Sequence, residues 1–296
     1  MLWFLSLAQE GKLNLIAEAV AAAKTADTIV MVLGDNEMTS REAWADKHLG
    51  DRATLDLMGQ QNDLAKAIFD LGKPTVVFLL NGRPMSVNLL AERADALVEG
   101  WYLGQETGHA AADILFGRAN PGGKLPVSIA RNVGQLPIFY NHKPSARRGY
   151  LDGSTKPLYP FGFGLSYTSF DISAPRLAKA TIRANESTRV EVDVTNTGRR
   201  QGDEVVQLYI RDDISSVTRP VLELKAFRRV TLQPGEKRTV VFDIKPADGL
   251  AIGRLDADSR SSGNPGKFFI YLYHPCNSPQ SPSTYPSRNG WPDRTR

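Results

Sequence analysis

The sequence predicts an α/β domain with a mostly parallel sheet sandwiched by helices, followed by an all-β immunoglobulin- or fibronectin III-like sandwich. Two continuous apolar runs, TIVMVL at 28–33 and TVVFLL at 75–80, are typical of strands buried on both faces. Segments with helical apolar spacing separate these runs, a rhythm that indicates parallel strands covered by helices. After residue 188 the pattern changes to short alternating segments that are typical of a β-sandwich.

The elements of the α/β part follow from apolar spacing and from breakers. LNLIAEAVAAAK and GQQNDLAKAIFDL have helical periodicity, and Gly72, Lys73 and Pro74 end the second of these segments. Weaker patterns indicate two further helices and one short strand. The expected elements are a helix at 13–24, a strand at 28–33, a helix at 59–71, a strand at 75–80, a helix at 84–91, a strand at 96–98 and a helix at 105–116.

The β part is preceded by a segment rich in glycine, proline and aromatic residues, 121–168, which we interpret as an ordered linker region. In TRVEVDVT the valines alternate with polar residues, and QPGEK is a turn signal. The expected strands lie at 188–195, 204–210, 222–230, 238–244 and 268–273.

These patterns divide the chain into four parts. We expect the α/β domain at 1–142, a linker at 143–174 and the β-sandwich at 175–275. The remaining segment, 276–296, is rich in Ser, Pro and Arg and is predicted to be disordered.

Composition excludes several classes of protein. The net charge of +4 is spread along 296 residues without a dense basic patch, which argues against nucleic-acid binding. No apolar stretch approaches the roughly 18 residues of a membrane helix, and the opening MLWFLSL lacks the flanks of a signal peptide. We therefore expect no membrane association and no signal peptide, while localisation stays open. The single cysteine, Cys276, excludes an internal disulfide framework.

The segment with the most chemical groups is GDNEMTSREAWADKHLGDR, residues 34–52, which leaves the carboxyl end of the first buried strand. Sites in open α/β sheets gather at that edge. Glu42 near Trp44 is a plausible sugar-facing acid, because an apolar aromatic neighbour raises a carboxyl pKa and glycoside hydrolysis needs a protonated acid. From composition alone, a solvated ion pair of Glu42 with Arg41 stays the more common alternative.

Other chemistries lack their motifs. The four histidines and the cysteine have no metal-ligand spacing, so no metal site is expected. Neither a dinucleotide fingerprint nor a phosphate-binding loop occurs, and no G-x-S-x-G elbow is present. We expect no cofactor.

An ordered series of motifs resembles family 3 glycoside hydrolases, in particular the bacterial β-glucosidase/β-xylosidase group. The resemblance covers residues 13–252. It is carried by ADTIVMVLG, SREAW, GDRATLDL, GKPTVVFLLNGRP, EGWYLGQETGHAAADILFGRANPGGKLPVSIARNVGQLPIFYNH, LYPFGFGLSYTSF, VTNTGRRQGDEVVQLYIRD and LKAFRRVTLQPGEKRTVVFDI.

The resemblance implies a retaining mechanism shared between two domains. In the family an N-terminal barrel carries an Asp nucleophile, and a loop of the α/β domain places the acid/base Glu over the barrel. Glu42 looks like that acid/base, with Asp35 and Glu37 as alternatives. Arg41 and Trp44 would shape the leaving-group subsite. The nucleophile has no counterpart in this chain.

The chain departs from the family pattern at both ends, since it contains no barrel and its polar segment 251–267 and basic tail look unlike the family. We therefore expect the isolated chain to be inactive and expect a β-linked oligosaccharide and a separate barrel polypeptide as partners. The alternatives are a non-catalytic carbohydrate- or protein-binding module and a truncated inactive gene product. Full-length relatives are often periplasmic or secreted.

Overall fold

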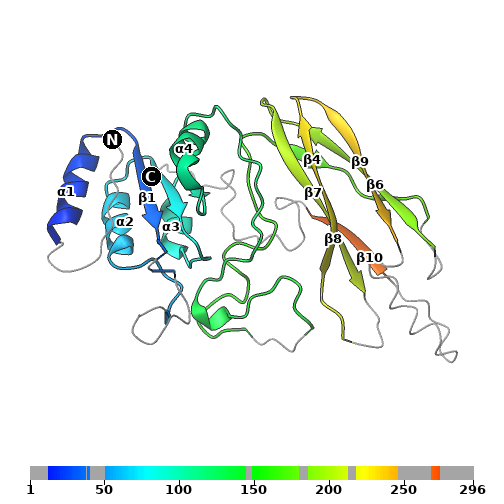
Figure 1. Ribbon diagram of the computed structural model, residues 1–296, viewed down its shortest axis with the longest axis horizontal. Coiled ribbons are helices and arrows are strands. Elements are labelled where there is room, and N and C mark those ends of the chain that lie inside the picture. The colour runs from blue at the N-terminus through cyan, green and yellow to red at the C-terminus, as the bar shows by residue number, and fades with distance from the viewer. Residues whose placement is uncertain are drawn as a thin grey trace, which may run out of the picture. The chain divides into compact units, whose positions relative to one another are not determined.

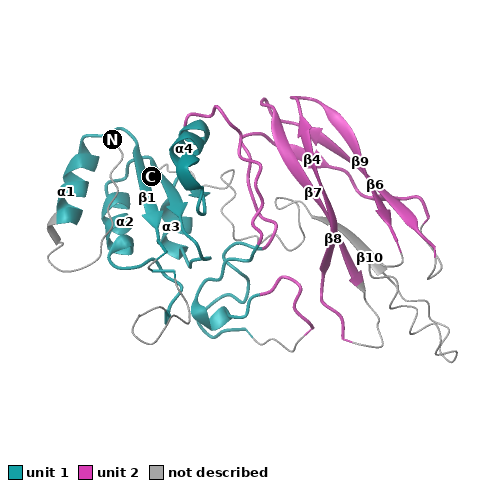
Figure 2. Ribbon diagram, in the orientation of Figure 1, with its two compact units in different colours: residues 1–115, 127–138, 149–160 teal, residues 116–126, 139–148, 161–296 magenta. Residues whose placement is uncertain are grey.

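The computed structural model describes residues 13–37, 39–40, 51–144, 149–179, 186–212, 218–245 and 268–273. It divides the chain into two compact units (Figure 2). Unit 1 comprises residues 1–115, 127–138 and 149–160, and unit 2 comprises 116–126, 139–148 and 161–296. The domain limits expected at 142 and 174 stay a prediction, because compactness assigns segments to units without testing which stretches fold on their own.

Unit 1 is built on a parallel sheet with strand order β1-β2-β3 (Figure 1). A helix follows each of the first two strands, as parallel pairing requires. In chain order the elements are α1 Leu13–Lys24, β1 Ile29–Gly34, α2 Gln61–Phe69, β2 Thr75–Leu80, α3 Asn88–Arg93, β3 Ala96–Glu99, the 3₁₀ helix η1 Gly104–Glu106, α4 Thr107–Leu115 and the 3₁₀ helix η2 Val133–Gln135. The expected α/β class is confirmed.

The core of unit 1 lies between the sheet and its helices. Val77, Phe78 and Leu79 of β2 are buried, in keeping with a central strand. Helix α2 contributes Leu64 and Ile68, which lie four residues apart and therefore on one helix face.

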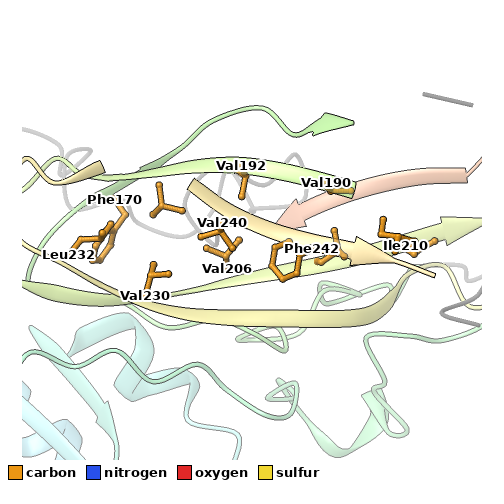
Figure 3. Packing of buried hydrophobic residues seen from close by; sticks show 12 residues of the cluster. Phe170, Val190, Val192, Val206, Ile210, Val230, Leu232, Val240 and Phe242 are labelled. Carbon is orange, nitrogen blue, oxygen red and sulfur yellow. The ribbon is translucent and has the colours of Figure 1, made fainter. Parts of the chain in front are cut away.

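Unit 2 contains two antiparallel sheets (Figure 1). One sheet has the order β10-β7-β8, and in the other β6 pairs with β4, β5 and β9. The strands are β4 Phe170–Ile172, β5 Arg176–Leu177, β6 Thr188–Asn196, β7 Gly202–Asp212, β8 Glu223–Leu232, β9 Lys237–Ile244 and β10 Phe268–Tyr273. Inward side chains of β6, β7, β8 and β9 form one hydrophobic cluster, as expected for a sandwich (Figure 3).

Two buried polar groups join the parts of unit 2. Asn196 is fully buried, and its amide nitrogen donates to the carbonyls of Arg200 (2.7 Å) and Leu232 (2.9 Å). Lys124 Nζ lies 3.0 Å from Glu204 Oε1, and the two side chains are only 8% and 3% exposed. Lys124 also donates to the Gly164 carbonyl at 2.9 Å. These groups are fully engaged, as buried polar groups in a stable core must be.

Candidate functional site

The residues proposed from the sequence as acid/base and subsite groups, Glu42, Arg41 and Trp44, lie outside the described residues. The structure does describe the segments on both sides of 41–50. Of the two alternatives to Glu42, Asp35 is half-buried directly after β1, and Glu37 is exposed. The geometry of the site is therefore built from the carboxyl edge of the parallel sheet, where this loop begins.

Gly34, at the end of β1, fixes where the loop leaves the sheet. Its φ of 147° lies in the region that glycine alone adopts readily. A Cβ atom at this position would lie 1.8 Å from the Leu80 carbonyl oxygen of β2. The Gln61 side chain accepts from the Gly34 N–H and donates to the Gly34 carbonyl, both at 2.8 Å. The conformation in which the chain leaves β1 is therefore fixed by the Leu80 carbonyl and by the Gln61 side chain.

Asp35 connects the loops that follow all three strands. Its Oδ1 accepts hydrogen bonds from the Gly82 N–H at 2.9 Å, after β2, and from the Tyr102 hydroxyl at 3.0 Å, after β3. The Ser40 hydroxyl lies 3.2 Å from that of Tyr102. We call Asp35, Ser40, Gly82 and Tyr102 the edge node. In this node Asp35 Oδ1 is the shared acceptor that connects the loops after β2 and β3 to the loop after β1.

The segment between Asp35 and Ser40 is a short turn held by its own polar groups. The amides of Thr39 and Ser40 both donate to the Asn36 carbonyl, at 3.1 and 3.0 Å. The Asn36 backbone N–H donates to Thr39 Oγ1 at 3.0 Å, and Ser40 Oγ lies 2.8 Å from the Asn36 carbonyl and 3.2 Å from the Tyr102 hydroxyl, so its single proton serves one of these two acceptors. Asn and Thr favour such local bonds between side chain and backbone. The turn therefore gives Ser40, the residue before Arg41, a defined position.

Glu99 is the titratable group with the most altered acidity at this edge. Burial raises its pKa to about 7, and the negative charge of Asp35 acts in the same direction. Its Oε1 accepts from the Trp101 N–H at 3.2 Å, which stabilises the ionised form only partly. A carboxyl group with this pKa holds or releases a proton near neutral pH.

Two other features near Glu99 cost stability, a strained backbone conformation and buried polar atoms without a hydrogen-bond partner. Trp101 has a φ of 53°, a left-handed conformation that costs of order 1–3 kcal/mol in a residue other than glycine. Within the described part of the chain, Asp35 Oδ2 and Asn81 Oδ1 are buried and have no hydrogen-bond partner. Strained backbone and unsatisfied polar atoms concentrate at functional sites. Sequence reasoning missed Glu99 and Tyr102, although both follow the expected strand at 96–98 at the same sheet edge.

The described residues lack two kinds of feature. No helix among them is long and apolar enough to cross a membrane. They also contain no group of three or more His, Cys, Asp or Glu side chains placed to hold a metal ion.

Comparison with known proteins decides the family. Residues 7–167 match the glycosyl hydrolase family 3 C-terminal domain, which is more than half of the chain. The chain belongs to glycosyl hydrolase family 3. Residues 204–273 match the fibronectin type III-like domain, so both parts of the predicted family resemblance are confirmed.

Curated relatives are similar over most of this chain. A β-xylosidase of Formosa agariphila is 47% identical over 257 residues, covering 86% of this chain and 34% of its own length. A periplasmic β-glucosidase of Salmonella typhimurium is 40% identical over 269 residues, covering 87% of this chain and 34% of its own length. The chain therefore spans about a third of the length of these relatives.

Solved β-glucosidase structures agree with the fold. A β-glucosidase from Erythrobacter marinus has a TM-score of 0.77 and 53% identity, covering 79% of this chain and 31% of the other. A Listeria innocua β-glucosidase in complex with glucose has a TM-score of 0.74 and 39% identity, covering 81% of this chain and 34% of the other.

Proposed function

We propose that this chain supplies the acid/base side of a retaining β-glycosidase that hydrolyses O-glycosyl bonds of β-linked oligosaccharides. The observation that carries the proposal is its membership of glycosyl hydrolase family 3, together with relatives named β-xylosidase and β-glucosidase. In the proposal a barrel domain, which these 296 residues do not include, contributes the Asp nucleophile.

Glu42 is the proposed acid/base residue. It would protonate the leaving oxygen in the first step and activate water in the second, as a retaining mechanism requires. Its position supports this role, because it lies eight residues after the end of β1 and open α/β sheets bind ligands beyond the carboxyl ends of their strands. Arg41 and Trp44 would line the leaving-group subsite, where an aromatic face can stack on a pyranose.

The proposal predicts that the chain alone hydrolyses glycosides negligibly. Without the nucleophile no glycosyl-enzyme intermediate forms, and losing one member of a catalytic pair costs several orders of magnitude in rate. The test mixes the purified chain with a separately produced family 3 barrel polypeptide and measures nitrophenol release from aryl β-glucosides and β-xylosides. Turnover by the chain alone at a rate similar to that of the mixture would contradict the proposal.

The role of Glu42 is tested in the same mixture with Glu42→Gln. Hydrolysis of a phenyl glycoside, whose leaving group needs protonation, should fall about a hundredfold or more. The cleavage step of a dinitrophenyl glycoside should be nearly unaffected, and azide should restore turnover by replacing the activated water. Glu37→Gln, an exposed glutamate of the same loop, is the matched control. If only Glu37→Gln shows this pattern, the acid/base assignment moves to Glu37; if neither does, a non-catalytic binding module is favoured.

A further inference from the structure

Tyr102 makes contacts that its burial does not explain. The side chain is 53% exposed, so hydrophobic burial contributes little to its placement. Its ring nevertheless lies against the backbone of the loop after β2, because a Cβ at Gly82 would be 2.6 Å from Tyr102 Cε2. Its hydroxyl donates to Asp35 Oδ1 and approaches the Ser40 hydroxyl. The placement of Tyr102 is therefore set mainly by its polar end.

The hydroxyl joins two loops that are far apart in sequence. Tyr102 follows β3, while Asp35 and Ser40 lie 67 and 62 residues earlier, after β1. The turn from Asn36 to Ser40 transmits this link along the chain, since the Ser40 N–H donates to the Asn36 carbonyl while its hydroxyl can donate to Tyr102. Losing the hydroxyl would leave the Ser40 end of the turn held only by its internal bonds.

Ser40 lies two residues before Glu42. Because consecutive Cα atoms are about 3.8 Å apart, fixing Ser40 confines the Glu42 Cα to within about 7 Å of the Ser40 Cα. An error of about 1 Å in the placement of a reacting group can cost a hundredfold in rate. A contact that fixes the position of Ser40 therefore affects the position of Glu42 and, through it, the catalytic rate.

We propose that Tyr102 is a positioning residue. Its hydroxyl is held by Asp35 and contacts the Ser40 hydroxyl, and it thereby fixes the position from which the segment carrying Glu42 begins. The inference rests on the proposed acid/base role of Glu42. Tyr102 itself makes no contact with reacting atoms in this scheme. Its ring packs against the backbone at Gly82, and its hydroxyl connects Asp35 with Ser40.

The deciding measurement is amide hydrogen exchange of the turn in the full chain. Tyr102→Phe keeps the ring and removes the hydroxyl, and should accelerate exchange at Thr39 and Ser40 about tenfold, the equivalent of one lost hydrogen bond. Exchange in β2 and α2 should stay unchanged, whereas a general loss of structure would accelerate it there too. Tyr150→Phe is the matched control, because this exposed tyrosine of the same unit donates to the Gly134 carbonyl. Unchanged exchange at Thr39 and Ser40 would overturn the inference.

A second pair of variants separates the hydroxyl contact from side-chain volume. Ser40→Ala should reproduce the faster exchange at Thr39, and Ser40→Thr, which keeps a hydroxyl, should restore protection. In the mixture with the barrel polypeptide, Tyr102→Phe should lower kcat about tenfold or more with KM changed less than about twofold, because the change misplaces the acid and leaves sugar binding intact. An unchanged kcat would overturn the positioning role.

The two proposals fail in different ways. If Glu42→Gln leaves hydrolysis unchanged, the proposed function is wrong and the catalytic meaning of the Tyr102 link is lost with it, although the exchange result still reports whether the link exists. If Glu42→Gln abolishes hydrolysis while Tyr102→Phe alters neither exchange nor kcat, the function stands and the inference about Tyr102 is wrong.

Discussion

Replacing Glu99 by glutamine should stabilise the chain at neutral pH and leave its stability at low pH almost unchanged. The pKa of Glu99 is raised from 4.5 to about 7, mainly by burial. A raised folded-state pKa means that the folded chain binds a proton that the unfolded chain releases between these values. The stability associated with Glu99 is therefore fully present below pH 4.5 and is lost as the pH rises through about 7.

The size of the effect follows from the same shift. Where the folded chain holds one extra proton, the free energy of unfolding falls by up to about 1.4 kcal/mol per pH unit. Over the whole interval the loss approaches about 3 kcal/mol, an upper value because Glu99 retains some contact with solvent. Glutamine cannot ionise and can still accept from the Trp101 N–H. The advantage of Glu99→Gln over the wild type should thus grow from near zero at pH 4.5 to about 2–3 kcal/mol at pH 8.

Urea unfolding between pH 4.5 and 8.5, followed by tryptophan fluorescence, measures this difference. Trp101 lies two residues after Glu99 in unit 1, so its fluorescence reports on the unit that contains Glu99. Glu92→Gln, an exposed glutamate of α3 in the same unit, controls for the change in net charge. A stability difference between Glu99→Gln and wild type that stays constant within about 0.5 kcal/mol across this range would refute the reasoning.

Two further predictions concern residues whose surroundings tolerate little change. Gly34→Ala should cost at least about 2–3 kcal/mol in urea unfolding, because its Cβ would meet the Leu80 carbonyl at 1.8 Å in a backbone conformation that alanine avoids. Lys124→Met should cost about 3–5 kcal/mol by leaving the Glu204 carboxylate buried and unpaired, while Lys124→Met combined with Glu204→Leu should recover most of that loss. A double variant no more stable than Lys124→Met alone would show that the loss has another cause.

Much of the fold could be predicted because periodicity fixes regular elements directly. The helix at 13–24 and the strands at 75–80 and 268–273 have the limits expected from the sequence. The helix expected at 84–91 instead spans Asn88–Arg93, and that expectation was wrong in its first half. The cause is tertiary, since Ser86 donates from its amide to Leu55 and from its hydroxyl to Ala130. The Ser86 N–H and hydroxyl are thus bonded to other segments and not to a helical turn at 84–87.

Other differences have equally local causes. The helix expected at 105–116 divides into η1 and α4, beginning at Gly104, whose φ of 70° turns the chain there. The strands β4 and β5 were missed because two or three residues carry no readable alternation. The turn expected at 233–237 does occur, but β8 and β9 belong to different sheets, so it carries the chain across the sandwich.

The edge node was beyond sequence reasoning for a different reason. Asp35 and Tyr102 lie 67 residues apart, and their contact depends on β2 lying between β1 and β3. Apolar patterns predict strands without fixing their order in the sheet. The same holds for Glu99, whose acidity depends on burial beside Asn81 and on the charge of Asp35, neither of which is adjacent in sequence.

The place where strained and unsatisfied groups gather bears on where function resides. In unit 2 the buried Asn196 amide makes four hydrogen bonds and Lys124 is paired, whereas Arg219 Nε is buried without a hydrogen-bond partner among the described residues. At the carboxyl edge of the unit 1 sheet, a carboxyl group of raised pKa, a left-handed tryptophan and two unsatisfied oxygens occur together. Natural sequences usually confine such departures to functional sites, where they are retained despite their cost in stability. The co-occurrence of these features therefore favours the sheet edge of unit 1 as the functional part of the chain, independently of which carboxylate donates the proton.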